Sequence, residues 1–214
     1  PVTQEFGDRY PVTPTPTKVD ELVVQKLRKV GIVPSDLCTD AEFLRRASLD
    51  VTGTLPTTKE LREFMAETDP EKRSRKIDEL LERPGYVAWW TTRLCDFTGN
   101  SDDKLNNVTP VKAEASKQWY AWIEKRVRDN VPYDEIVEGI VMAVSRDPGE
   151  SYQQYCENVS KFYPKDGPGA SGYADRASLP HYWARQNFQS SEDRVIGFAY
   201  TFLGTRIQCA QCHK

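Results

Sequence analysis

The residues with the clearest chemistry stand together near the end of the sequence, in the string Cys209-Ala210-Gln211-Cys212-His213. Covalent attachment of haem requires two thiols, which add across two vinyl groups, and an imidazole beside the second thiol that can reach the iron. The chain holds only five Cys and two His in 214 residues, so chance is a poor explanation for this string. The string predicts one covalent haem c, with Cys209 and Cys212 as attachment points and His213 as proximal iron ligand.

Three other interpretations of the two thiols are less favoured by their spacing. A zinc site needs a second ligand pair, and only the single residues Cys38, Cys95, Cys156 and His181 remain to supply one. A thioredoxin-type dithiol usually opens a helix in a βαβ unit, and no such pattern surrounds Cys209. A structural disulfide between Cys209 and Cys212 is the least favoured of the three.

The second axial ligand of the iron is not fixed by the string. His181 is the only other imidazole, and it lies in the apolar and aromatic stretch 179–183. We expect it either to ligate the iron, giving a bis-histidine pair with His213, or to find a hydrogen-bond partner, because a buried unpaired imidazole is costly. Met142 and then Met65 are lower-ranked candidates, and both lie on apolar helical stripes where core packing is more common.

Composition bounds the class of protein. Charged residues of both signs make up 29% and hydrophobic residues 38%, with a mean hydropathy of −0.65. No apolar run approaches the roughly 20 residues of a membrane helix, and a net charge of −3 without a basic stripe argues against nucleic acid as a partner. Covalent haem attachment predicts a compartment outside the cytoplasm, either the periplasm or the cell surface.

Helical patterns recur along the chain and no segment alternates like a strand, so the sequence predicts an all-α domain over residues 18–214 with seven or eight helices. Residues 1–17 carry four prolines and are expected to be an extended lead-in. Four capping boxes should open helices, at Thr17, Thr39, Thr57 and Ser190. Other helices are expected after Asp69, over 86–97 and 111–130, and from Pro132 to about 144.

Some burial can also be predicted. The tryptophans of the 86–97 and 111–130 segments are more often core than cofactor contacts, and Cys95 should be an inert buried thiol. The helix that begins after Ser190 is apolar nearly all round and should be buried. Residues 146–178 break the helical rhythm with several glycines, which predicts a long irregular loop before the haem-binding segment at about 179–214.

Two stretches resemble a known family. The first is Phe43-Leu-Arg45-Arg46-Ala-Ser-Leu49-Asp50-Val-Thr-Gly53-Thr-Leu-Pro56-Thr57, and the second is Phe202-Leu-Gly204-Thr-Arg206-Ile-Gln208-Cys209-Ala-Gln-Cys212-His213. Together they are similar to the DUF1549 or PSCyt2 domain, a cytochrome-type module of large surface or periplasmic proteins of planctomycetes. The resemblance implies haem attachment at Cys209 and Cys212, with His213 as proximal ligand. It also implies a following His-Pro-Phe-Asp segment and a second domain, DUF1553.

Arg45, Arg46 and Asp50 of the first stretch could touch a haem propionate, but a polar network that holds the following turn at Thr52 and Gly53 is the more ordinary expectation.

The sequence therefore predicts an electron-transfer domain whose partner is a redox protein or a fused C-terminal domain. The alternatives are a haem enzyme module with an open sixth position, which ligand binding in solution would reveal, and a non-redox scaffold that binds zinc or nothing. A hydrolase triad is disfavoured because it would have to recruit His181.

Overall fold

A computed structural model describes residues 10–100, 114–164, 169–186, 188 and 190–212. Within these ranges the fold is all-α, as predicted, with ten α-helices, two short 3₁₀ helices and no strand. The elements in chain order are α1 (Lys18–Lys29), α2 (Asp40–Thr52), α3 (Thr58–Ala66), α4 (Lys72–Leu81), α5 (Pro84–Thr98), α6 (Glu114–Arg128), α7 (Tyr133–Val141), α8 (Tyr152–Ser160), η3 (Tyr173–Asp175), α9 (His181–Gln186), α10 (Ser191–Phe202) and η4 (Gln208–Gln211).

The helices begin where local hydrogen bonds dictate. All four predicted capping boxes form, at Thr17, Thr39, Thr57 and Ser190. In each box the hydroxyl of the capping residue accepts a hydrogen bond from the backbone N–H three residues later. The carboxylate of that later residue accepts one from the backbone N–H of the capping residue, so two donors at the helix end are satisfied. Asp69 is different, because it caps a turn by accepting from Glu71 N at 2.8 Å, and α4 begins only at Lys72.

The segment 146–178 is more ordered than its glycines suggest. It contains α8, which opens with a fifth capping box between Ser151 and Gln154, and the short helix η3. α8 carries Tyr152, Tyr155, Cys156 and Val159 at helical spacing but buries none of its residues, and the glycines on either side of it, such as Gly149, indicated a loop instead. Together with the six-residue α9, it accounts for the helix count exceeding the seven or eight expected.

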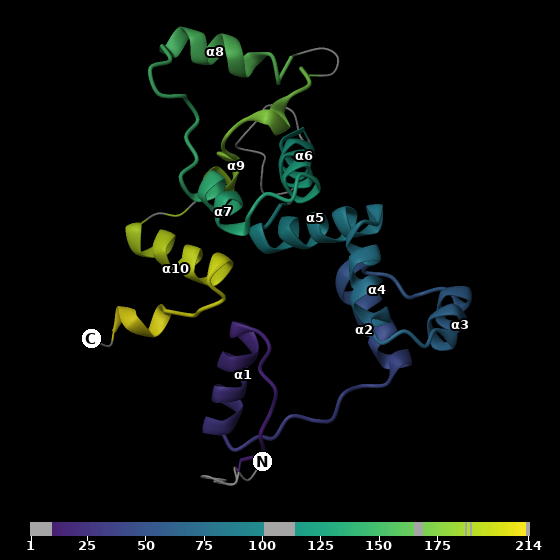
Figure 1. Ribbon diagram of the computed structural model, residues 1–214. Coiled ribbons are helices and arrows are strands. Elements are labelled where there is room, and N and C mark those ends of the chain that lie inside the picture. The colour runs from purple at the N-terminus through teal and green to yellow at the C-terminus, as the bar shows by residue number, and fades with distance from the viewer. Residues whose placement is uncertain (1–9, 101–113, 165–168, 187, 189, 213–214) are drawn as a thin grey trace.

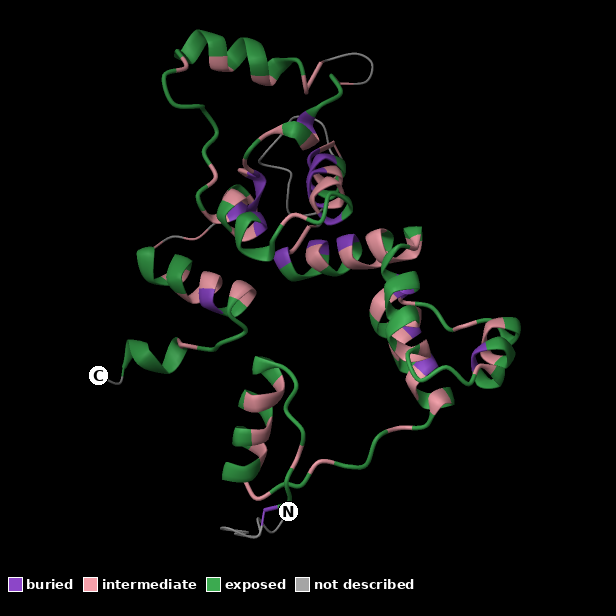
Figure 2. Cartoon of the chain, viewed as in Figure 1, coloured by how far each residue is buried: buried purple, intermediate pink, exposed green. Residues whose placement is uncertain are grey.

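Figure 1 shows how the helices are grouped. α2, α3 and α4 pack together at one end, α5 connects them to a second group around α6, α7 and α9, and α1 stands apart near the N-terminus. α6 has the most buried residues, and α2, α5, α7 and α9 have two or three each (Figure 2), whereas α1 has none. None of the described helices has the length and apolarity needed to cross a membrane.

Each helix of the α2–α4 group buries one apolar side chain almost completely, namely Leu44, Phe64 and Leu80, and surface charge pairs and one close contact with α5 add to this packing. Gly53 ends α2 at φ +70°, and a Cβ there would lie 2.4 Å from a ring carbon of Trp89 on α5, so only glycine allows this approach. Thr52 holds the same turn by donating to Ser48 O at 2.8 Å. Arg45, Arg46 and Asp50 are exposed and form no ion pair within the described residues. The polar network expected from these three side chains therefore does not hold the turn at Thr52 and Gly53.

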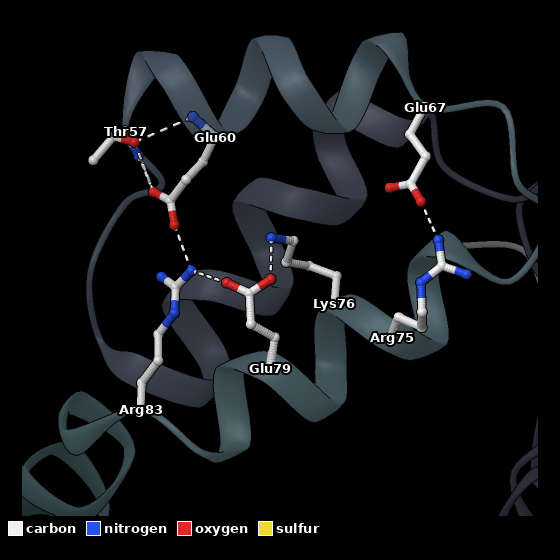
Figure 3. A network of polar contacts seen from close by, with 7 residues as sticks. All are labelled: Thr57, Glu60, Glu67, Arg75, Lys76, Glu79 and Arg83. Carbon is white, nitrogen blue, oxygen red and sulfur yellow. Dashed lines mark hydrogen bonds and ion pairs between the residues drawn. The ribbon is translucent and has the colours of Figure 1, made fainter.

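Charged side chains link α3 to α4 on the surface. Arg83 bridges Glu60 and Glu79, and Arg75 pairs with Glu67 (Figure 3). Glu60 also closes the capping box of α3. The Thr57 backbone N–H and hydroxyl, helped by Arg83, lower the pKa of Glu60 to about 2, so the carboxylate stays charged through this arrangement.

The main core lies where α5, α6, α7 and α9 meet. Trp119, Trp122 and Ile123 of α6 are fully buried, and Cys95 is buried, as predicted. Each tryptophan satisfies its ring N–H, with Trp119 donating to Thr98 Oγ1 at 3.1 Å and Trp122 donating to a backbone carbonyl at 2.9 Å. A buried indole needs such a partner.

The prediction that α10 is buried was wrong. Only Ala199 of α10 is buried, whereas Val195, Tyr200 and the following Leu203 are each more than half exposed. A helix that is apolar on every side can bury only the face that has a neighbour. Here the neighbours are α9, reached through Phe202 against Tyr182, Phe188, which lies against Gly197, and the ends of α5 and α7, while the face with Val195 and Tyr200 stays uncovered.

Candidate functional site

The cysteine pair follows α10 on a short turn. Gly204 reverses the chain at φ +60°, and Thr205 N donates back to Ala199 O at 3.1 Å. η4 then begins, and Cys212 N donates to Cys209 O at 3.2 Å, which closes the turn that carries both cysteines. His213, the predicted proximal ligand, lies outside the described residues.

Both cysteines are exposed free thiols. In a 3₁₀ turn, residues three apart eclipse one another, and a rise of about 2 Å per residue separates them by about 6 Å along the axis. Cys209 and Cys212 therefore lie on one side of their turn, with no disulfide between them. Two free, exposed thiols on one side of a turn form the donor set that covalent haem attachment requires.

Apolar surface is exposed next to this turn. On α10, Val195 is 56% exposed, Tyr200 56%, and the capping residue Leu203 62%. Arg206, between α10 and η4, places its guanidinium carbon 5.7 Å from the Tyr200 ring centroid. The end of α10 also borders α5 and α7, where Phe97 and Tyr133 are about half exposed. A groove of about 570 Å³ lies between α5, α6 and α7, and no α10 residue is among its described lining. A planar apolar group would find several uncovered partners here.

His181 lies in the core rather than beside the cysteines' helix. It is 4% exposed, its Nε2 lies 3.1 Å from Gln118 Oε1 on α6, and its ring stacks on Tyr173 with centroids 5.1 Å apart. The Tyr163 hydroxyl donates to the same Gln118 oxygen at 2.6 Å. Burial, aided by the charge of Arg176, lowers the pKa of His181 to about 4, so the imidazole is neutral at pH 7.

Consecutive residues of α9 face different neighbours. His181 contacts α6 and η3, while Tyr182 packs on Trp119 and on Phe202 of α10. The structure thus brings His181 to Gln118 and Tyr173, and brings α10 to Tyr182. Because Gln118 Oε1 can only accept, Nε2 of His181 carries the proton and Nδ1 keeps the lone pair that a metal would need. Ligation of iron by His181 stays a prediction.

One comparison with known proteins identifies the family. The sequence model of PSCyt2, described as a protein of unknown function (DUF1549), matches residues 18–214. The chain belongs to the PSCyt2 family. The match begins at the first residue of α1 and includes η4, so the apolar surface of α10 and the cysteine turn are parts of the PSCyt2 domain. No curated protein and no solved structure matches the chain.

The methionines of this PSCyt2 domain lie apart from each other. Met142 caps the C-terminal end of α7 and is 69% exposed, and Met65 on α3 is 50% exposed, so neither fills the core as expected. Within the described residues, no three His, Cys, Asp or Glu side chains come together in a way that could hold a metal ion.

Sequence reasoning missed the residues that surround His181 in this PSCyt2 domain. Gln118 lies 63 positions away on α6, and Tyr163, Tyr173 and Arg176 fall in the segment read as an irregular loop. The available signal was the concentration of tyrosines in that segment, which an unstructured loop does not need. Only the fold shows that these side chains meet one histidine.

Proposed function

We propose that this PSCyt2 domain binds one haem c covalently through Cys209 and Cys212, with His213 as proximal ligand, and transfers electrons outside the cytoplasm. The observation that carries the proposal is the pair of free, exposed thiols on one side of the η4 turn, directly before His213. The bound haem would supply one-electron chemistry at its iron. A redox protein or a fused C-terminal domain would be the partner.

The chain's own residues would contribute attachment and apolar surface. Each thiol adds its sulfur to one carbon of a vinyl group and its proton to the other, so the step needs reduced thiols and no oxidant. Val195, Tyr200 and Leu203 of α10 would cover part of the macrocycle and lower its access to water, which is one determinant of potential. This accounts for large apolar side chains left uncovered on the helix that leads to the cysteines.

A haem enzyme module with an open sixth position is the second candidate. The observation that favours it is the hydrogen bonding of His181, whose Nε2 faces Gln118 at 3.1 Å and whose ring stacks on Tyr173. Although Nδ1 keeps its lone pair, the ring is 4% exposed and stacked on Tyr173, so the side chain must leave the core before it can become an axial ligand. The iron would then keep a coordination position for an external ligand.

The test is expression with c-type maturation machinery, followed by acid–acetone extraction and a pyridine haemochrome spectrum. Wild type should retain its colour, and Cys209→Ala and Cys212→Ala should each lose one thioether bond. Cys156→Ala is the matched control, because this exposed cysteine lies on α8 outside the string. Colourless wild-type protein with stoichiometric zinc would refute the proposal.

The spin state then separates the two candidates. A low-spin ferric spectrum that becomes high-spin and binds carbon monoxide in His181→Ala would establish the bis-histidine pair. A spectrum that is high-spin in wild type, or unchanged by the substitution, would exclude His181 as ligand. An open wild-type site favours the enzyme module.

A further inference from the structure

Helix α1 is left largely uncovered by the other helices. It stands apart from them near the N-terminus (Figure 1), and none of its residues is buried (Figure 2). A helix of 12 residues is only marginally stable alone in water, so contact with another surface usually supports it. Nothing in the proposed haem function uses α1.

The segment before α1 covers one side of the helix. Tyr10 is buried, its ring lies 5.8 Å from the guanidinium carbon of Arg28, and its hydroxyl donates to Ile32 O at 2.8 Å. Val24 and Leu27 are half-buried, and their spacing places them on the same side of α1 as Arg28. This side of the helix therefore has contacts within the chain.

The other side of α1 is apolar and exposed. Val19 is 69% exposed, Leu22 55% and Val23 50%. Their spacing of three and four residues places them on one side of the helix. Ile32, which follows the turn at Gly31, is also exposed and adds apolar surface at the end of α1. Neighbouring apolar side chains that face water are typical of a surface that binds a partner.

The charges on this exposed side are all positive. Lys18, Lys26 and Lys29 lie among or beside its apolar residues, by the same spacing. Lys18 pairs with Glu21 at 2.7 Å. Lys26 and Lys29 form no ion pair within the described residues. Asp20 and Glu21 are the acidic residues of α1, and both lie away from the exposed side, so the helix separates its charges by face.

The combination of apolar and positive groups selects the partner. A surface that takes up this side of α1 must offer an apolar layer and negative charge together. An anionic lipid bilayer offers both, because its acyl chains accept valine and leucine side chains while lysine side chains extend to the phosphate groups. α1 has four basic and two acidic residues in a chain of net charge −3, so the other parts of the chain are repelled and α1 turns toward the bilayer.

From these observations we propose that α1 binds the protein reversibly to the surface of an anionic lipid bilayer. The helix lies in the plane of the interface, with Val19, Leu22 and Val23 toward the acyl chains and with Lys26 and Lys29 at the phosphate groups. It does not span the bilayer, because 12 residues are about 18 Å long and the hydrocarbon core is about 30 Å thick. A single short helix gives weak binding, and this binding does not depend on haem.

The test is co-sedimentation of the full chain with lipid vesicles. The probe is a vesicle of phosphatidylglycerol and phosphatidylcholine in equal parts, and the control is a vesicle of phosphatidylcholine alone. The partition coefficient should be at least tenfold higher on the anionic vesicles, because each lysine near an anionic surface contributes about a fivefold increase. Added salt should lower it, since the lysines are exposed and their charges are screened.

The lysine variants test the electrostatic part. Lys26→Gln combined with Lys29→Gln should lower the partition coefficient on anionic vesicles about 25-fold. Lys59→Gln combined with Lys161→Gln is the matched control, because it removes the same charge from exposed residues outside α1. This control should bind like wild type.

The apolar variants test the insertion of side chains. Leu22→Gln combined with Val23→Gln keeps every charge and should weaken binding at least tenfold, because two apolar side chains no longer enter the acyl layer. Leu55→Gln combined with Met65→Gln changes two similarly exposed residues outside α1 and should bind like wild type. Circular dichroism of all four variants should match wild type, since each substitution is at an exposed position.

Three results would overturn the proposal. The first is equal binding of wild type to neutral and anionic vesicles, and the second is undiminished binding of Lys26→Gln with Lys29→Gln. The third is no binding to anionic vesicles together with a dimer in light scattering that Leu22→Gln with Val23→Gln converts to monomer, because a second copy of the chain would then cover α1. Haem-free and haem-loaded protein should bind alike, so failure of haem attachment and failure of this surface are observed separately.

Discussion

The burial of His181 makes the stability of the fold depend on pH in a specific interval. The unfolded chain takes up a proton at this imidazole near pH 6.5, whereas the folded protein does so only near pH 4. Between these values the unfolded state therefore binds more protons, and the free energy of unfolding falls as the pH falls from 6.5 to 4. Lowering the pKa of His181 from 6.5 to about 4 corresponds to a loss of about 3 kcal/mol in the free energy of unfolding once the imidazole is protonated.

The comparison that isolates this contribution uses His181→Phe. Phenylalanine keeps a ring against Tyr173, and the Tyr163 hydroxyl still donates to Gln118 at 2.6 Å, so no buried acceptor is left unpaired. Urea unfolding is measured in both proteins at intervals from pH 7 to pH 4. Carboxylates titrate in the same range but contribute equally to both proteins.

We expect the wild type to lose about 3 kcal/mol more than His181→Phe across this interval, nearly all of it below pH 6.5. Parallel profiles for the two proteins would refute the reasoning, because they would mean that the imidazole protonates equally easily in the folded and unfolded states. A rise in wild-type stability on acidification would refute it more directly.

Three further predictions concern other parts of the fold. Gly53→Ala should lower the free energy of unfolding, measured in urea, by about 2–4 kcal/mol, because the new Cβ is strained at a left-handed φ and clashes with the Trp89 ring. Gly149→Ala should lower it by only about 1 kcal/mol, because nothing lies within 4 Å of its Cβ. Equal losses in the two variants would contradict the packing argument. Glu60→Gln should destabilise the protein by about 1 kcal/mol at pH 7. Thermal unfolding of variant and wild type should show this stability difference vanish as the pH falls from 4.5 to about 2, because wild-type Glu60 becomes protonated there. In haem-free protein, iodoacetamide followed by mass spectrometry should label exposed Cys156 quickly and leave Cys95 unlabelled, because burial raises the pKa of the Cys95 thiol to about 11; labelling at equal rates would contradict this burial.

The sequence determined those features that depend on residues a few positions apart. The capping boxes at Thr17, Thr39, Thr57 and Ser190 form as predicted because their hydrogen bonds span only three residues. The spacing of Cys209 and Cys212 is likewise local, and one 3₁₀ turn places them on the same side. The helix α8 was missed although its capping box and apolar spacing are equally local, because the glycines on either side of it indicated a loop.

Only the tertiary structure decided which surfaces are covered. α10 has the composition of a buried helix, but only Ala199 is buried, because its neighbours cover the side with Gly197 and Phe202 and leave Val195 and Tyr200 exposed. From the sequence, His181 could face either the haem segment or the core. Its hydrogen bond with Gln118, which lies 63 residues earlier, places its side chain in the core. Hydrophobic periodicity shows that one face of a helix needs burial. Which element covers that face depends on contacts between segments far apart in the chain, and no local sequence pattern encodes those contacts.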